Sequence, residues 1–224
     1  VWLTIDDKSI SDGNALKFLI GAIAVAMAVY HLYIAYVGVL AHWQHRAIHL
    51  SFALTLVFLS HRAAPRAPPI LQKFFWLLDI VALCAIGLIA WYTITQHLDI
   101  QQRVGMVADT DKIAAAALIV LTIEATRRVV GLPMALIGVA FIVFVFYGTY
   151  LPGRLGHPSF STSKITEQFF NSTGGIYGSP IAASAVYITL FIVFGAFLNR
   201  SGAGDFFGEM SRAVTGRSVG GPAK

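Results

Sequence analysis

Long apolar runs alternate with short polar segments along the whole chain. An α-helix rises 1.5 Å per residue, so about 20 residues cross a hydrocarbon core roughly 30 Å thick. Runs 47–60 and 113–125 are shorter than this, and the pattern leaves open whether each crosses fully. The pattern predicts an all-α, polytopic membrane protein with about six transmembrane helices. The predicted spans are 15–40, 47–60, 74–95, 113–125, 129–150 and 181–198.

Two polar segments are predicted to contain short amphipathic helices that lie at the membrane surface. In segment 161–171, Ile165, Phe169 and Phe170 share one side. In the second, Asp205 is the expected N-cap of a helix that runs through Thr215. The apolar face of this second helix consists of Phe206, Phe207, Met210 and Val214.

Polar and proline-rich stretches predict where the spans begin and end. Residues 42–46 are expected to form a short linker with an interfacial tryptophan, and residues 97–112 a polar loop. Prolines in segment 65–69 prevent a continued helix, because proline lacks the amide donor. Pro133 and Pro180 are expected in first helical turns, where a missing amide costs little.

Composition changes the picture by excluding whole classes of protein. Hydrophobic residues make up 57% of the chain and charged residues only 12%, so part of the solvent must be lipid. Nucleic acid is not an expected partner, because the basic residues are scattered and Arg127-Arg128 is the longest basic run. The single cysteine, Cys84, is expected to be a buried thiol within an apolar helix.

The distribution of positive charge predicts the orientation. With the N-terminus in the cytoplasm and six spans, eleven of the 16 Lys and Arg residues lie on the cytoplasmic side. Segment 152–175 then faces the periplasm.

Histidines are the first candidate ligands. His31 lies within the first span, and His42, His45 and His49 follow at helical spacings. One interpretation is a haem held by His31 and a linker histidine; the other is a set of solvated histidines at the membrane interface, which we favour. A zinc site from His45 and His49 lacks the further ligands that zinc requires.

Two acidic residues lie within predicted spans, Asp79 and Glu124. A charge in lipid is costly, so a role in transport has to be weighed. Each lies near a span boundary, and Glu124 can pair with Arg127 or Arg128 on one helix face. We therefore expect both to be structural.

The sequence does not indicate an enzyme. It contains no Ser/His/Asp, Cys/His or paired-carboxylate arrangement, and the glycine cluster at 202–204 lacks the Lys-Ser/Thr of a phosphate loop. No catalytic, cofactor-binding or metal-binding residue is assigned.

Several phrases in the last half of the chain occur in the order typical of one transporter family. They are Glu124-Ala-Thr-Arg-Arg-Val-Val-Gly-Leu-Pro133, Gly174 to Pro180, Phe194-Gly-Ala-Phe-Leu198, Ser201-Gly-Ala-Gly-Asp-Phe-Phe207 and Gly220-Gly-Pro-Ala-Lys224. The chain resembles the fused permeases of tripartite ATP-independent periplasmic (TRAP) transporters, most closely the TAXI type. Before residue 124 the resemblance rests on span count and spacing alone.

The resemblance implies a sodium-coupled importer of organic acids that works with a periplasmic TAXI-type substrate-binding protein. It implies that residues 1–128 are a four-helix small-subunit-like scaffold and that 129–224 begin the large subunit. Substrate-binding residues are then expected beyond Lys224, in the remainder of the large permease subunit. The other partner is membrane lipid, in the cytoplasmic (inner) membrane. The alternative function is a haem-binding membrane anchor of a redox complex.

Overall fold

The computed structural model describes residues 14–38, 41–64, 68–103, 105–153, 156–158 and 160–215. These residues form helices, turns and connecting segments without a β-strand, which confirms the all-α prediction. Pro65 and the motif at 220–224 lie outside the described residues.

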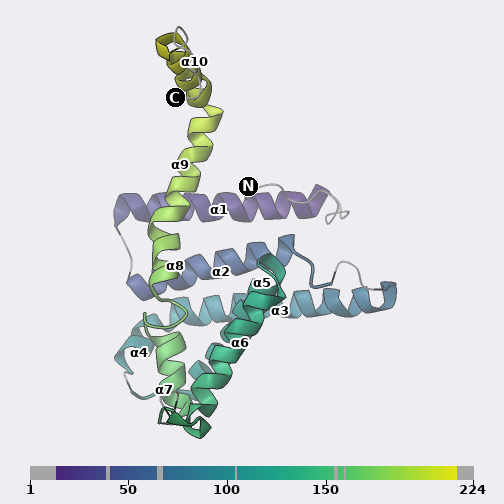
Figure 1. Cartoon of the computed structure of the whole chain (residues 1–224), viewed down its shortest axis with the longest axis vertical. Coiled ribbons are helices and arrows are strands. Elements are labelled where there is room, and N and C mark those ends of the chain that lie inside the picture. The colour runs from purple at the N-terminus through teal and green to yellow at the C-terminus, as the bar shows by residue number, and fades with distance from the viewer. Residues whose placement is uncertain are drawn as a thin grey trace.

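Three helices of the N-terminal half lie side by side. They are α1 (Asn14–Val37), α2 (His42–Ser60) and α3 (Pro69–Thr95), and α2 lies between the other two (Figure 1). The short α4 (His97–Gln102) leads to α5 (Asp109–Val129), which packs against both α2 and α3. Segment 97–112 therefore contains a helix and the start of another, where the sequence predicted a loop.

The second half crosses the first. Helix α6 (Leu132–Tyr147) packs along α5 and ends in a single 3₁₀ turn, η1 (Gly148–Tyr150). Helix α7 (Thr162–Thr166) continues into the π-helical η3 (Glu167–Asn171). A continuous rod then passes α2 and α1 on its way to the far end of the molecule (Figure 1). The rod consists of α8 (Ser179–Ala183), the π-helical η4 (Ser184–Ile188) and α9 (Thr189–Arg200), and α10 (Ala203–Thr215) follows it.

Within the described part of the chain, four helical segments are long and apolar enough to cross a membrane: 14–37, 70–95, 132–150 and 179–200. They confirm a polytopic membrane protein. The two short predicted runs lie in α2 and α5, which are less apolar and supply much of the buried core. Pro133 and Pro180 stand in the first turns of α6 and α8, as predicted.

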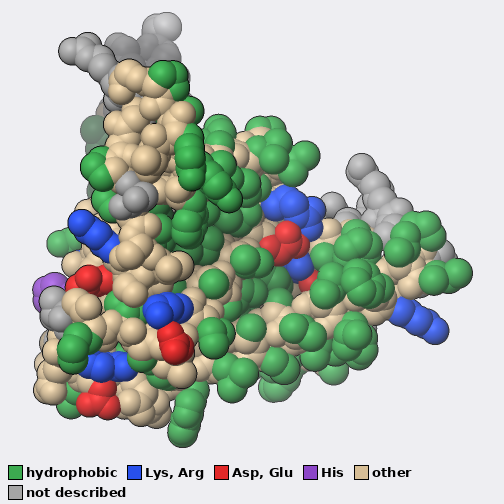
Figure 2. All heavy atoms as spheres, turned by 90° about the horizontal axis from the view of Figure 1, so that it is seen from below, with side chains coloured by type: hydrophobic (Ala, Val, Ile, Leu, Met, Phe, Trp, Pro, Cys, Tyr) green, Lys and Arg blue, Asp and Glu red, His purple; other side chains and the backbone are tan. Residues whose placement is uncertain are grey.

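Much of the outer surface is apolar, as Figure 2 shows for one face of the molecule. Trp76 and Trp91 are largely exposed on α3. Cys84 is also exposed on this helix, so the prediction of a buried thiol was wrong. A helical period of 3.6 residues turns Cys84 away from the core face that holds Ile86 and Ile89.

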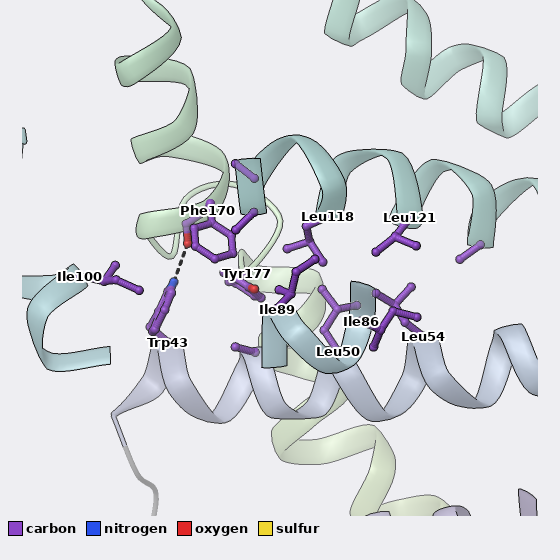
Figure 3. Packing of buried hydrophobic residues seen from close by; sticks show 14 of the residues in the cluster. Trp43, Leu50, Leu54, Ile86, Ile89, Ile100, Leu118, Leu121, Phe170 and Tyr177 are labelled. Carbon is purple, nitrogen blue, oxygen red and sulfur yellow. Dashed lines mark hydrogen bonds between the residues drawn. The ribbon is translucent and has the colours of Figure 1, made fainter. Parts of the chain in front are cut away.

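The buried core joins α2, α3, α5 and the segment between α7 and α8 (Figure 3). Leu50 and Leu54 of α2 pack with Ile86 of α3 and Leu118 of α5. Its largest fully buried side chains include Phe170 and Tyr177. Ile165 and Phe170 are thus covered by protein, where the sequence predicted contact with the membrane surface.

Two further predictions about helix ends were wrong. Residues 42–46 are the first turns of α2 and not a linker, because Trp43, His45 and Arg46 all have tertiary partners that hold them. Helix α10 begins before Asp205, which lies in its first turn and is not its N-cap. The helix itself was predicted correctly, and Phe206 is exposed on it; its position at the membrane surface stays a prediction.

The connection between α5 and α6 requires glycine. Gly131 has φ of 117°, in the left-handed region that favours glycine, and it precedes the first residue of α6. The chain can therefore reverse direction within two residues and lay α6 against α5.

Candidate functional site

A chain of hydrogen bonds crosses the buried contact between α1, α2 and η4. His31 Nδ1 lies 2.7 Å from the carbonyl oxygen of Met27, and its Nε2 lies 3.0 Å from Nδ1 of His49. His49 Nε2 in turn lies 3.0 Å from the hydroxyl of Ser184. His31 and His49 are almost completely buried. We call these three side chains, with the Met27 carbonyl, the histidine chain.

The Met27 carbonyl, at one end of the histidine chain, sets the direction of its hydrogen bonds. A carbonyl oxygen can only accept, so Nδ1 of His31 carries a proton. A neutral His31 then presents an unprotonated Nε2, to which Nδ1–H of His49 donates. Nε2 of His49 is left as the acceptor for the Ser184 hydroxyl. Every polar atom of the histidine chain is thus satisfied, as buried polar groups require.

His45 lies beside the histidine chain. Its ring centroid is 5.4 Å from that of His31, and its Nδ1 lies 3.0 Å from the hydroxyl of Tyr30. The sequence singled out His31, His45 and His49, and the structure brings these three together. His42 lies in the first turn of α2 and is exposed.

The geometry does not fit a haem or a zinc ion. A metal between two imidazole nitrogens, at about 2 Å from each, holds them roughly 4 Å apart. His31 and His49 are hydrogen-bonded at 3.0 Å, which leaves no space for an ion between them. Among the described residues, no group of three or more His, Cys, Asp or Glu side chains can hold a metal. The redox-anchor alternative therefore receives no support.

Arginines form a second polar centre, which we call the arginine clamp. Arg128 on α5 lies 2.7 Å from Asp79 of α3 and 2.8 Å from Glu124. The contact with Asp79 is an ion pair without hydrogen-bond alignment, since the same carboxylate oxygen has no hydrogen-bond partner. Arg127 also pairs with Glu124, at 2.7 Å.

The arginine clamp also fixes the end of α2. Arg127 donates to the carbonyl of Ala63, and Arg128 donates to that of His61 and lies over the ring of Phe58. The clamp contains two arginines and two carboxylates, so its formal charges cancel. Both carboxylates thus reach arginines, as expected for Glu124, and their structural role stays a prediction.

A third polar centre surrounds Asp111, which is fully buried at the start of α5. Its carboxylate accepts hydrogen bonds from the Tyr92 hydroxyl at 2.5 Å, the Ala108 amide at 2.9 Å and the Asn171 side chain at 3.4 Å. Arg103 lies 3.7 Å away. Asp111 therefore joins α3 and α5 to η3 while it caps the first turn of its own helix.

The segment between α7 and α8 inserts into the bundle, and we call residues 170–178 the plug. Trp43 donates from its indole nitrogen to the carbonyl of Phe170 at 2.7 Å (Figure 3). Arg46 donates to the carbonyl of Tyr177 at 2.8 Å. Burial raises the pKa of the Tyr177 phenol, and a hydrogen bond with Thr93 opposes this only in part. The phenol is therefore neutral in the core.

Glycine makes the plug possible. A Cβ atom on Gly175 would lie 2.3 Å from the carbonyl oxygen of Gln168 and 2.5 Å from Cα of Phe169. Both are backbone atoms, which cannot move aside as a flexible side chain can. The sequence analysis noted this glycine pair only within the phrase from Gly174 to Pro180, and nothing in the sequence indicated the close approach.

Residues 117–224 match the family model described as the tripartite ATP-independent periplasmic transporter, DctM component. Over this segment the chain is similar to a TRAP permease. The match supports the TRAP family that the motifs from residue 124 onward indicate, and it is to a family of transporters and not of enzymes. No significant match to a curated protein or to a solved structure was found.

The polar centres connect this TRAP-like segment, residues 117–224, to the helices before it. His49 reaches Ser184, Trp43 reaches Phe170, and Arg46 reaches Tyr177, each across more than 120 positions of sequence. Asp111 and Asn171 make a further link. The sequence analysis missed Ser184 and the backbone acceptors, because neither a lone serine nor a carbonyl has a signature in sequence.

Proposed function

We propose that this chain is the fixed frame of a sodium-coupled TRAP permease of the fused, TAXI type, which imports organic acids delivered by a periplasmic binding protein. In this proposal residues 1–128 are the small-subunit-like scaffold, and 129–224 are the first helices of the large subunit. Substrate and sodium are bound by the remainder of the large subunit, beyond Lys224. The protein lies in the cytoplasmic membrane with its N-terminus in the cytoplasm.

The observation that carries the proposal is the insertion of the plug into the N-terminal bundle. A frame has to hold its parts in one arrangement while another part of the carrier moves. Two hydrogen bonds to plug carbonyls, the buried rings of Phe170 and Tyr177, and the Asp111 centre all resist separation of the TRAP-like segment from α2 and α3. These contacts hold the TRAP-like segment and the N-terminal helices in one arrangement.

Uptake into proteoliposomes tests this function. The whole permease is reconstituted and given radiolabelled mono- and dicarboxylates, with and without the periplasmic binding protein and an inward sodium gradient. We expect uptake only when both are present. Uptake that is equal without the binding protein would contradict the TRAP mechanism, and uptake that is equal without sodium would contradict the coupling ion.

Labelling tests the orientation. Lys164 is exposed between the last two membrane-crossing segments. A Lys164→Cys variant on a Cys84→Ser background is predicted to react with a membrane-impermeant maleimide in intact cells whose outer membrane has been made permeable. Reaction only after the cytoplasmic membrane is opened would contradict a periplasmic position.

A further inference from the structure

The histidine chain has a property that a merely structural polar contact does not need: it can take up a proton without moving a heavy atom. We propose that His31 and His49 form a binding site for a single proton, held between α1, α2 and η4. The site rests on the geometry of these residues and does not depend on the proposed transport function.

In the neutral histidine chain the hydrogen bonds all point in one direction, from the Ser184 hydroxyl through His49 to His31 and the Met27 carbonyl. Adding a proton to Nε2 of His49 reverses only the first of these bonds. His49 then donates to the Ser184 oxygen, which accepts as readily as it donates. The proton can also reside on His31, if the shared hydrogen between the two rings moves to Nε2 of His31. Both forms keep the same distances.

A second proton does not fit. It would place an N–H on Nε2 of His31 and an N–H on Nδ1 of His49, face to face across 3.0 Å. Two positive rings would also lie with their centroids 5.1 Å apart. The charged and titratable groups that line the adjacent pocket are His42, His45, Arg46 and Tyr187. None of the described residues that line it is acidic, so no carboxylate there offsets a second positive charge. The pair is thus a site for one proton, unlike two independent histidines.

A pocket of about 390 Å³ lies beside the histidine chain. Its lining from α2 includes His42, His45 and Arg46, and its lining from the opposite rod includes Ser179 and Tyr187. His45 contacts both the pocket and the histidine chain, because its ring lies 5.4 Å from that of His31 and its Nδ1 is bonded to Tyr30 of α1. His45 therefore lies between the pocket and the histidine chain.

Ser184 lies where protonation of His49 changes the hydrogen bonding of the rod. It is the first residue of the π-helical η4, and its carbonyl accepts from the Thr189 hydroxyl at 2.8 Å, five residues on. Single π-helical turns inside α-helices are frequent at functional sites. Protonation changes Ser184 from donor to acceptor and frees its hydroxyl hydrogen for a carbonyl of its own helix. The proton thus alters hydrogen bonding in the rod that crosses α1 and α2.

Nuclear magnetic resonance on the intact protein tests the site. The full chain, labelled with ¹⁵N-histidine and held in lipid nanodiscs, is examined by ¹⁵N–¹⁵N correlation from about pH 8 to about pH 5, the range in which histidine titrates. At the alkaline end we expect a coupling across one hydrogen bond that joins a protonated Nδ1 to an unprotonated Nε2 of another ring. On acidification the pair takes up one proton and keeps this coupling.

Variants assign and control the signal. His49→Gln is expected to abolish the coupling, and His61→Gln, an exposed histidine at the end of the same helix, to leave it unchanged. Ser184→Ala removes the acceptor of the protonated form and should lower the midpoint of proton uptake by about one pH unit, a tenfold weaker site. Ser51→Ala, which loses a bond within α2, should not move it.

Two results would overturn the proposal. One is the absence of any coupling between histidine rings at the alkaline end in the unaltered protein, which needs no variant to fold. The other is conversion of both rings to the doubly protonated form in a single step with the midpoint of His61. The assay contains neither substrate nor sodium, so its failure is distinct from failure of the transport proposal.

Discussion

The indole nitrogen of Trp43 donates to the carbonyl oxygen of Phe170 at 2.7 Å, although 127 positions of sequence separate the two residues. The two rings also meet edge to face, with centroids 6.1 Å apart. One residue at the start of α2 thereby fixes both the backbone and the side chain of the plug. Residues 42–46, which the sequence predicted to be a linker, therefore anchor the TRAP-like segment.

Replacing Trp43 by Phe tests this anchor. The substitution keeps an aromatic ring but leaves the buried carbonyl of Phe170 without its donor. An unsatisfied buried polar group costs about 1–3 kcal/mol. We expect the free energy of unfolding, measured by denaturant titration of the protein in mixed micelles, to fall by that amount.

Trp91→Phe is the matched control, because Trp91 is 71% exposed on α3. Surface substitutions usually change stability by less than about 0.5 kcal/mol. Equal effects of the two substitutions would show that the bond to Phe170 contributes nothing to the stability of the frame.

Arg128→Gln is predicted to be the most damaging single change in the arginine clamp. Arg128 is almost completely buried, and its loss leaves Asp79 in the protein interior without a counter-charge. Breaking a buried ion pair from one side costs about 3–5 kcal/mol. Lys112→Gln removes a cation from an exposed pair with Asp109, where we expect a much smaller loss of stability.

A second substitution checks the cause. If the damage comes from the unpaired Asp79, then Asp79→Asn combined with Arg128→Gln should be more stable than Arg128→Gln alone. Neighbouring residues in one network are expected to show such non-additive effects. Simple addition of the two single effects, in a double-mutant cycle of unfolding free energies, would show that Asp79 and Arg128 are not coupled.

Gly175→Ala is predicted to displace the plug. The new methyl group would overlap the backbone at Gln168 and Phe169. Overpacking of this kind costs typically about 1–3 kcal/mol, and here the neighbours are backbone. The thermal midpoint should fall, and the fluorescence of Trp43 should shift toward that of an exposed indole.

Gly195→Ala is the opposite case. Gly195 lies in α9, and a Cβ there meets no atom within 4 Å. Alanine in a helix interior is favoured over glycine by roughly 0.5–1 kcal/mol. A gain in stability at Gly195 together with a loss at Gly175 is the expected pair of results. Similar effects at both positions would contradict the close approach seen at the plug.

The helices were largely predictable from the sequence, because hydrophobic runs and prolines act locally. Four predicted spans reappear as long apolar helices, and Pro133 and Pro180 stand where a first turn tolerates them. Residues 42–46 could not be assigned in this way. Their helix is stabilised by partners on the plug and on α1, which no local pattern records.

The candidate site was predictable only in part. The sequence showed His45 and His49 at a helical spacing and His31 in the preceding span, although it placed His45 in a linker. The hydrogen bond between His31 and His49, however, depends on how α1 crosses α2, and its extension to Ser184 depends on the position of the rod. The ion pair of Glu124 and Arg128 was easier to predict than the histidine contacts, because the two residues are neighbours on one helix.

Cleavage of the connection between α4 and α5 tests most directly the claim that the N-terminal helices and the TRAP-like segment form one frame. Met106 is 73% exposed in that connection, so a protease site inserted there can be cut in the purified permease. After the cut, we predict that the two pieces remain associated in mild detergent and still support uptake that depends on the binding protein. Pieces that separate on cutting, in a permease that carries unaltered Trp43 and Arg46, would contradict the account.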